Sequence, residues 1–229
     1  MVSQEKTNIF TYKFSHIEKQ RMRAMGITAV FVILFWTTFY QSFSSITLYA
    51  RDHVDRVVMG YSVPVPWFAA LNSILGIVLA PIIALVWEKL GGKKCTTPVK
   101  MTLGIFSMGT AFLLMSISVI STGGTNTGVK AGMWFIVFAY LFNTISELCI
   151  APVGIAMFNR LAPQRFSTFF MGMWYMTMFV ASFISGKVAG FTQNVGFLAI
   201  FASLSGILFF MGFVLFGIRK YLNNLMEQK

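Results

Sequence analysis

Long apolar stretches separated by short polar segments recur six times along the chain. Each is long enough to cross the hydrocarbon core of a bilayer as a helix, which needs about 20 mainly apolar residues. The turns between them carry helix-breaking pairs such as Gly91-Gly92 and Ala162-Pro163. The pattern therefore predicts an all-α membrane protein with six transmembrane helices. The predicted spans are 25–50, 64–88, 99–121, 133–159, 168–191 and 197–218.

Composition supports a chain surrounded by lipid. Hydrophobic residues make up 56% of the 229 positions and charged residues 11%, whereas soluble domains are about one quarter charged. A chain of this length cannot bury so much apolar surface in water, so we expect the lipid bilayer to cover its outer face. The net charge of +11 could suggest nucleic acid as a partner. The charges form short clusters between apolar runs, however, so no nucleic-acid binding is predicted.

The distribution of Lys and Arg predicts the orientation. Six crossings place both termini on the same side of the membrane. Of the 18 Lys and Arg residues, only Arg51, Arg56, Lys130 and Lys187 fall on the other side. The positive-inside rule therefore predicts that both termini are cytoplasmic. The expected organisation is a cytoplasmic segment over 1–24 without a cleavable signal, a bundle over 25–222, and a cytoplasmic tail over 223–229.

One acidic residue, Glu147, falls in the middle of a predicted span. An ionised carboxylate there costs several kcal/mol unless it is paired, hydrated or protonated, so it is expected to face the bundle interior or a wet cavity. Asn143 one turn earlier and the adjacent Ser146 predict a polar stripe, and Pro152 predicts a bend nearby. Such a carboxyl group can exchange a proton for a substrate ammonium. The alternative is a carboxylate held permanently by a partner, for example Lys187 or a residue of another subunit.

Other polar residues divide the spans into two kinds. Trp36 and Tyr40 share a face of the first span, the second contains Asn72, and the fifth contains Trp174. Spans three and six have no charge, Asn or Gln in their cores, so we expect them to face lipid and spans one, two, four and five to line a cavity. In the fifth span, small residues recur at four-residue spacing, which favours close approach of another helix. They are Ser182, Gly186 and Gly190.

Motifs for catalysis and metal binding are not found in the sequence. It has no Ser-His-Asp set, zinc-ligand spacing, phosphate-binding loop or paired carboxylates, so neither an enzyme nor a metal or cofactor site is predicted. His16 and His53 have no other metal-ligating residues near them. Cys95 and Cys149 lie in a Lys-rich loop and a hydrophobic span, and both are expected to stay reduced.

Several motifs together resemble one transporter family. The segment FWTTFYQ over 35–41 resembles the seventh helix of proton-dependent oligopeptide transporters (POT/PTR), a branch of the major facilitator superfamily. Leu71-Asn72 with Ala80-Pro81 resembles the eighth helix of that family. The tenth-to-eleventh helix signature is matched by the segments over 146–154, 161–165 and 171–174. The likeness extends from about Glu18 to the end and covers only the second of the family's two six-helix halves.

The resemblance implies half of a major facilitator fold and a role in proton-coupled di-/tripeptide symport at the plasma membrane. Glu147 would bind the amino terminus of the peptide, and Asn72, Trp36 and Trp174 would line the same pocket. Tyr40 occupies a position where many relatives have Glu. The proton would be the coupling ion, with no cofactor. The Glu-x-x-Glu-Arg motif of the family's first half does not occur here, so an N-terminal half is the expected partner.

Three other interpretations stay open at the level of sequence. The chain could be a non-transporting membrane subunit in which the polar stripe stabilises an interface. Two copies could associate with each other, since the two halves of the superfamily are related by an approximate twofold axis. The substrate could also be another small solute, because relatives with this fold carry solutes other than peptides.

Overall fold

The computed structural model describes residues 12–91, 95–125 and 127–227. Six of its helical segments are long and apolar enough to cross a membrane, which confirms the number of predicted spans. The helices are α1 (His16–Phe39), η1 (Tyr40–Phe43), α2 (Ser45–His53), α3 (Pro66–Leu90), α4 (Thr97–Ser121), α5 (Trp134–Leu161), η2 (Gln164–Phe166), α6 (Ser167–Val195) and α7 (Phe197–Glu227).

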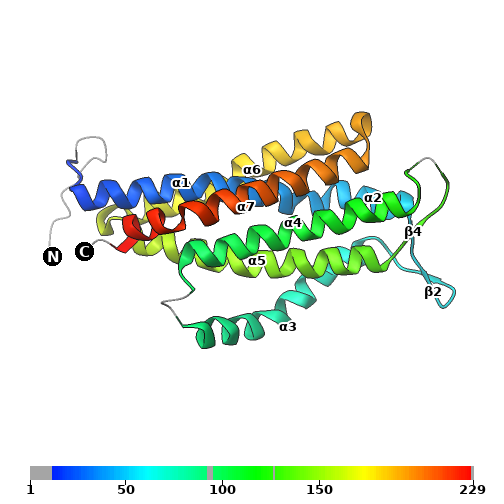
Figure 1. The fold of residues 1–229 in the computed structure, drawn as a ribbon, viewed down its shortest axis with the longest axis horizontal. Coiled ribbons are helices and arrows are strands. Elements are labelled where there is room, and N and C mark those ends of the chain that lie inside the picture. Colours follow the sequence, from blue (N-terminus) through cyan, green and yellow to red (C-terminus); the bar gives the residue numbers. More distant parts are fainter. Residues whose placement is uncertain (1–11, 92–94, 126, 228–229) are drawn as a thin grey trace.

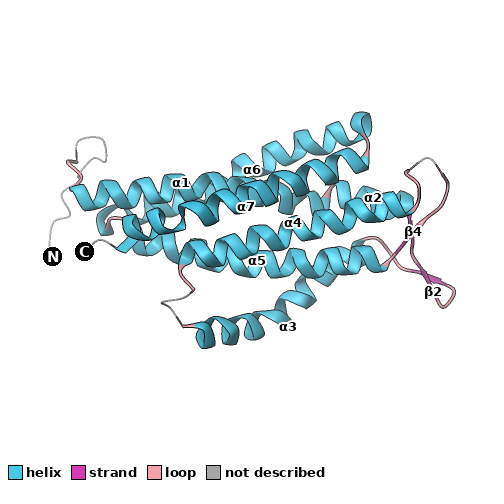
Figure 2. Ribbon diagram, in the orientation of Figure 1, coloured by secondary structure: helices cyan, strands magenta, loops and turns pink. Residues whose placement is uncertain are grey.

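The long helices run side by side along the longest axis of the molecule, and the start of α1 and the end of α7 lie at the same end (Figure 1). This arrangement agrees with an even number of crossings. At the opposite end, β1 (Val54–Asp55) pairs in parallel with β4 (Ala131–Gly132) (Figure 2). There, too, β2 (Val57–Val58) and β3 (Tyr61–Ser62) form a hairpin. Met59 and Gly60 both have positive φ, as the tight turn of a two-residue hairpin requires.

Local signals in the sequence set several helix ends. Ser15 and Glu18 form a capping box at the start of α1: the Glu18 amide donates to the Ser15 hydroxyl oxygen, and the Ser15 amide donates to the Glu18 carboxylate. Pro66 is the first residue of α3, and Gly196, whose φ is 87°, caps the C-terminal end of α6. Helix α1 begins nine residues before the predicted span, and α7 continues through most of the predicted tail to Glu227.

The first predicted span is interrupted rather than continuous. Helix α1 gives way to the 3₁₀ turn η1, and Ser44 then leaves helical geometry before α2 begins. The Ser42 carbonyl accepts hydrogen bonds from the Tyr140 hydroxyl at 2.8 Å and from the Thr47 hydroxyl at 2.7 Å. A helix can be broken at membrane depth only where other groups satisfy its backbone, and these two hydroxyls do so.

The prediction that span three faces lipid is wrong for much of its surface. Helix α4 buries a long face against α5 and α7, and 56% of its most apolar window is buried. Glycines allow the close approach: a Cβ on Gly104 would collide with Ile150 of α5, and one on Gly212 of α7 would collide with Phe106. Helices in lipid associate through small residues as well as through polar ones, so the lack of polar residues did not indicate exposure to lipid.

Two helices are poorly covered by the rest of the chain. In the most apolar 18-residue stretch of α3 no residue is buried, and in that of α6 28% of the residues are buried. Helix α3 packs mainly on α5 and diverges from the bundle toward its Leu90 end (Figure 1). These two helices correspond to the second and fifth predicted spans, which were expected to line a cavity.

Candidate functional site

The carboxylate of Glu147 lies halfway along α5 and is hydrogen-bonded to α3. The Asn72 side-chain amide donates to Glu147 Oε2 at 3.0 Å. Both side chains are only partly buried, so the pair is reachable from the poorly covered side of the bundle. The two residues predicted from different spans to share a site are therefore in direct contact.

Thr144 completes this group and was not predicted from the sequence. Its hydroxyl donates to Asn72 Oδ1 at 2.7 Å and also lies 2.8 Å from the Tyr140 carbonyl oxygen. A bond to Oδ1 leaves the NH₂ group of Asn72 facing the carboxylate, because an amide presents its donor and acceptor on opposite sides. The only available signal was that Thr144 lies three residues before Glu147 and so projects from nearly the same side of the helix.

Asn143 is directed toward the interruption of the first span. Its side-chain amide donates to the Ser42 hydroxyl oxygen at 2.7 Å, and its buried Oδ1 has no hydrogen-bond partner within the described part of the chain. With Tyr140, it connects α5 to η1. Asn143 therefore lies near the predicted site but stabilises the helix break and does not contact Glu147.

Ser146 does not share the face of Glu147. Its buried hydroxyl donates to the Gly104 carbonyl oxygen of α4 at 2.6 Å. The residues of the predicted polar stripe therefore contact three different elements. Glu147 bonds to α3, Asn143 bonds to η1, and Ser146 links α5 to α4. This part of the stripe prediction is wrong, because adjacent helical residues point about 100° apart.

Trp36 and Tyr40 form the aromatic pair that their spacing predicted. Their ring centroids are 5.7 Å apart, and Trp36 also contacts Phe35 and Phe39. Tyr40 is partly exposed, whereas the indole N–H of Trp36 is buried without a hydrogen-bond partner. Trp36 lies on the last turn of α1, and Tyr40 is the first residue of η1, where the interruption begins.

Trp174 is fully buried between α6 and α5. Its ring packs edge-on against Phe158, with 5.3 Å between centroids, and against Gly154, where any Cβ would overlap the indole. The indole N–H has no hydrogen-bond partner among the described residues. In this structure Trp174 contributes to helix packing, and its surface is covered by the chain itself.

The alternative that Lys187 neutralises Glu147 is not supported. Lys187 is exposed, with its ammonium 5.7 Å from the centre of the Phe183 ring. Within the described ranges the only salt bridge joins Arg51 and Asp52. The same residues contain no cluster of three His, Cys, Asp or Glu side chains that could hold a metal ion. Cys95 and Cys149 are both buried and unpaired.

Comparison with known proteins identifies the family. The sequence profile PTR2, described as the POT family, matches residues 1–207. The chain belongs to the POT family. It is 32% identical over 194 residues to the peptide transporter YePEPT of Yersinia enterocolitica and 31% identical over 183 residues to dipeptide and tripeptide permease B of Salmonella typhimurium. These alignments cover 80% and 79% of the chain and 37% of each relative.

Solved structures of the POT family give the same picture of the fold. A crystal structure of a peptide transporter POT in complex with sulfate matches with a TM-score of 0.87 and 28% identity. The match covers 96% of this chain and 44% of that one. The chain is therefore a multi-pass membrane protein with half of a major facilitator fold, and it spans well under half the length of these POT relatives.

Proposed function

We propose that the chain forms the C-terminal half of a proton-coupled di-/tripeptide symporter in the plasma membrane, with both termini in the cytoplasm. The observation that carries the proposal is the Glu147–Asn72 contact, which places a carboxylate at mid-membrane depth on a partly open face. A carboxyl group at that depth favours its neutral form until a cation arrives. The peptide ammonium supplies that cation, and Glu147 gives up its proton when the ammonium binds. In symport this proton must be released on the same side of the membrane as the peptide.

Asn72, Trp36 and Tyr40 complete the pocket in this proposal. Asn72 holds one carboxylate oxygen at 3.0 Å and leaves the other free for the ammonium. Trp36 and Tyr40 provide an aromatic wall beside the helix break, and broken helices commonly border transporter sites. The remaining predicted site residues support the site indirectly, because their contacts are with other parts of the chain. They are Trp174, Asn143 and Ser146.

The partner in this proposal is an N-terminal half that covers α3 and α6. Along α6, a Cβ on Gly186 or Gly190 would meet no atom within 4 Å among the described residues. A small-residue ridge that packs against nothing within its own chain is suited to a helix from outside. Transport then requires both halves, because alternating access moves one half against the other around a midplane site.

Peptide uptake in cells tests the proposal. Cells that express this chain together with the first half of a POT transporter should accumulate labelled dipeptide when an inward proton gradient is present, and cells with this chain alone should not. Glu147→Gln should abolish uptake, whereas Glu88→Gln, an exposed acid at the end of α3, should leave it unchanged. Full uptake by Glu147→Gln would refute the role of the carboxylate.

A second candidate is a non-transporting membrane subunit, which the unfilled α6 ridge also suits. Here the Glu147–Asn72 pair would stabilise an interface. Crosslinking from Gly190→Cys distinguishes the two candidates when it is combined with peptide binding across pH. A stable crosslinked partner without pH-dependent binding favours the subunit, and a crosslink to a second copy favours self-association.

A further inference from the structure

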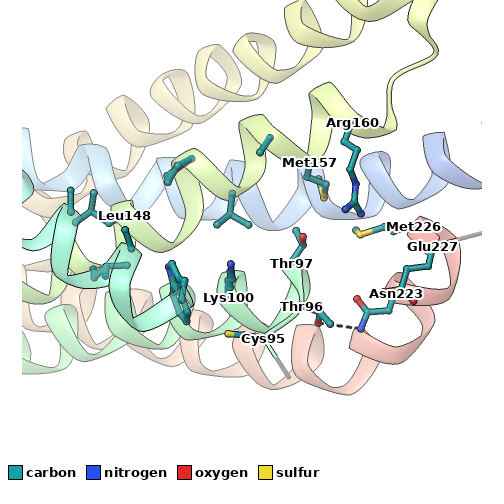
Figure 3. A pocket seen from close by; sticks show the side chains of 17 residues that line it. Cys95, Thr96, Thr97, Lys100, Leu148, Met157, Arg160, Asn223, Met226 and Glu227 are labelled. Atoms are coloured by element: carbon teal, nitrogen blue, oxygen red, sulfur yellow. Dashed lines mark hydrogen bonds between the residues drawn. The ribbon is translucent and has the colours of Figure 1, made fainter. Parts of the chain in front are cut away.

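A cavity that does not include Glu147 lies near the end of the bundle where α3 and α5 end and α4 begins. Its volume is about 660 Å³, and it separates α3 from α4, α5 and the last turns of α7 (Figure 3). Neither Glu147 nor Asn72 lines it. It exists because α3 diverges from the bundle toward its Leu90 end.

Most of the wall is apolar. Ala80 and Ala84 of α3 line it together with Pro152 and Val153 of α5. The small side chains of α3 leave the space unfilled, and Pro152 lacks a backbone N–H. This part of the cavity is suited to a hydrocarbon chain and offers a polar solute few hydrogen-bonding groups.

Two cations from α4 and α5 also line the cavity. Lys100 lies in the first turn of α4 and Arg160 in the last turn of α5, which puts both near the membrane interface. The Lys100 ammonium is 5.1 Å from the centre of the Trp87 ring. Neither cation forms a salt bridge to any residue that the structure describes. Glu227 is the one acid among the lining residues.

We propose that this cavity binds an anionic phospholipid, with its phosphate between Lys100 and Arg160 and one acyl chain along Ala80 and Ala84. Basic pockets between transmembrane helices bind anionic lipid headgroups, each nearby cation adding attraction. An inorganic phosphate would leave the apolar wall uncovered, and a zwitterionic lipid would gain less from two unpaired cations. The lipid would also fill the gap between α3 and α4, two helices that make few direct contacts.

Native mass spectrometry of the full chain in detergent tests the charge requirement. Phosphatidylglycerol should bind at least about tenfold more tightly than phosphatidylcholine, as expected from two cations near the headgroup. Lys100→Gln/Arg160→Gln should remove this preference. Arg219→Gln/Lys220→Gln loses the same charge at the same end but lies outside the cavity, so it should keep the preference. Equal loss in both double variants would overturn the proposal.

A steric variant tests the acyl-chain site without a change in charge. Ala84→Leu places a larger side chain on the cavity wall and should weaken phosphatidylglycerol binding several-fold. Ala202→Leu, at an exposed position on α7, should not. Unchanged binding in Ala84→Leu would contradict the assigned acyl position, and inorganic phosphate that competes as well as the lipid would show a site for the headgroup alone.

Trp87 provides a direct optical readout. Phosphatidylglycerol brominated on its acyl chain should quench the fluorescence of the wild-type chain more strongly than that of Trp87→Phe, because Trp87 lines the cavity. Brominated phosphatidylcholine should show a smaller difference. Equal quenching by the two lipids would refute a selective site.

Discussion

The absence of a side chain at Gly154 leaves room for the indole ring of Trp174. A Cβ at position 154 would overlap the indole, so glycine is the residue that allows the fully buried ring to lie against α5. The contact joins α5 and α6, which otherwise touch over a small area. Gly154 therefore determines how α6 sits beside the helix that carries Glu147.

Gly154→Ala is expected to destabilise the folded protein by roughly 1–3 kcal/mol, because overpacking forces the ring out of its place. Gly172→Ala provides the matched control, since a Cβ there meets no atom within 4 Å among the described residues. Thermal unfolding of both variants in the same detergent measures the difference. Equal midpoints would show that the ring adapts freely.

Thr144→Val is expected to disturb the position of the Asn72 side chain while the protein still folds. The variant keeps the shape of the side chain and removes the hydroxyl that bonds Asn72 Oδ1. Loss of one such hydrogen bond corresponds to about 1 kcal/mol, or about a fivefold weaker affinity for a dipeptide. Thr110→Val, whose hydroxyl bonds only the backbone of its own helix, should bind normally. Dipeptide titration of the complex of both halves provides the measurement.

At the scale of elements, the interrupted first span depends on groups from another helix. The Tyr140 hydroxyl and the Asn143 amide both bond to Ser42, which lies about one hundred residues earlier in the chain. Without the Tyr140 hydroxyl, Thr47 would be the one side chain that donates to the Ser42 carbonyl among the described residues. The break is therefore a tertiary feature rather than a property of the local sequence.

Tyr140→Phe is expected to loosen the segment around η1 while leaving the six helices in place. The lost donor costs about 1 kcal/mol, and backbone amides over 40–47 should exchange hydrogen several-fold faster than in the wild type. Tyr175→Phe, on the exposed side of α6, should leave exchange over 40–47 unchanged. Hydrogen exchange read by mass spectrometry makes the comparison, and identical rates in both variants would contradict the role of Tyr140.

The sequence was sufficient for features that depend on local patterns. Apolar runs predicted the number of spans, and the polar residues singled out in two of them, Glu147 and Asn72, are hydrogen-bonded to each other. It was insufficient where distant residues decide the outcome, as for the break at Ser44 and for Ser146, which bonds to Gly104 of α4. The burial of α4 was missed because tight packing in lipid depends on glycine positions as well as on polarity.

At the scale of the whole molecule, the two ends of the bundle differ in charge and structure. At one end lie the start of α1 and the last turn of α7, and at the other lies the hairpin of β2 and β3 (Figure 1). The cavity with Lys100 and Arg160 belongs to the first of these ends. The positive-inside rule predicts that this end faces the cytoplasm. The fold itself is the same in either orientation, so the charge distribution alone decides between them.

Cysteine labelling of intact cells checks this orientation. In a background with Cys95→Ser and Cys149→Ala, Ser62→Cys lies in the exposed hairpin and Asn224→Cys lies on the exposed side of α7 near the C-terminus. A membrane-impermeant maleimide should label Ser62→Cys in intact cells and Asn224→Cys only after the membrane is opened. The reverse pattern would place the cluster of basic residues outside the cell. It would also move the proposed lipid site to the outer leaflet. Anionic lipids and the negative surface potential belong to the cytoplasmic leaflet, so they would no longer favour occupation of the site.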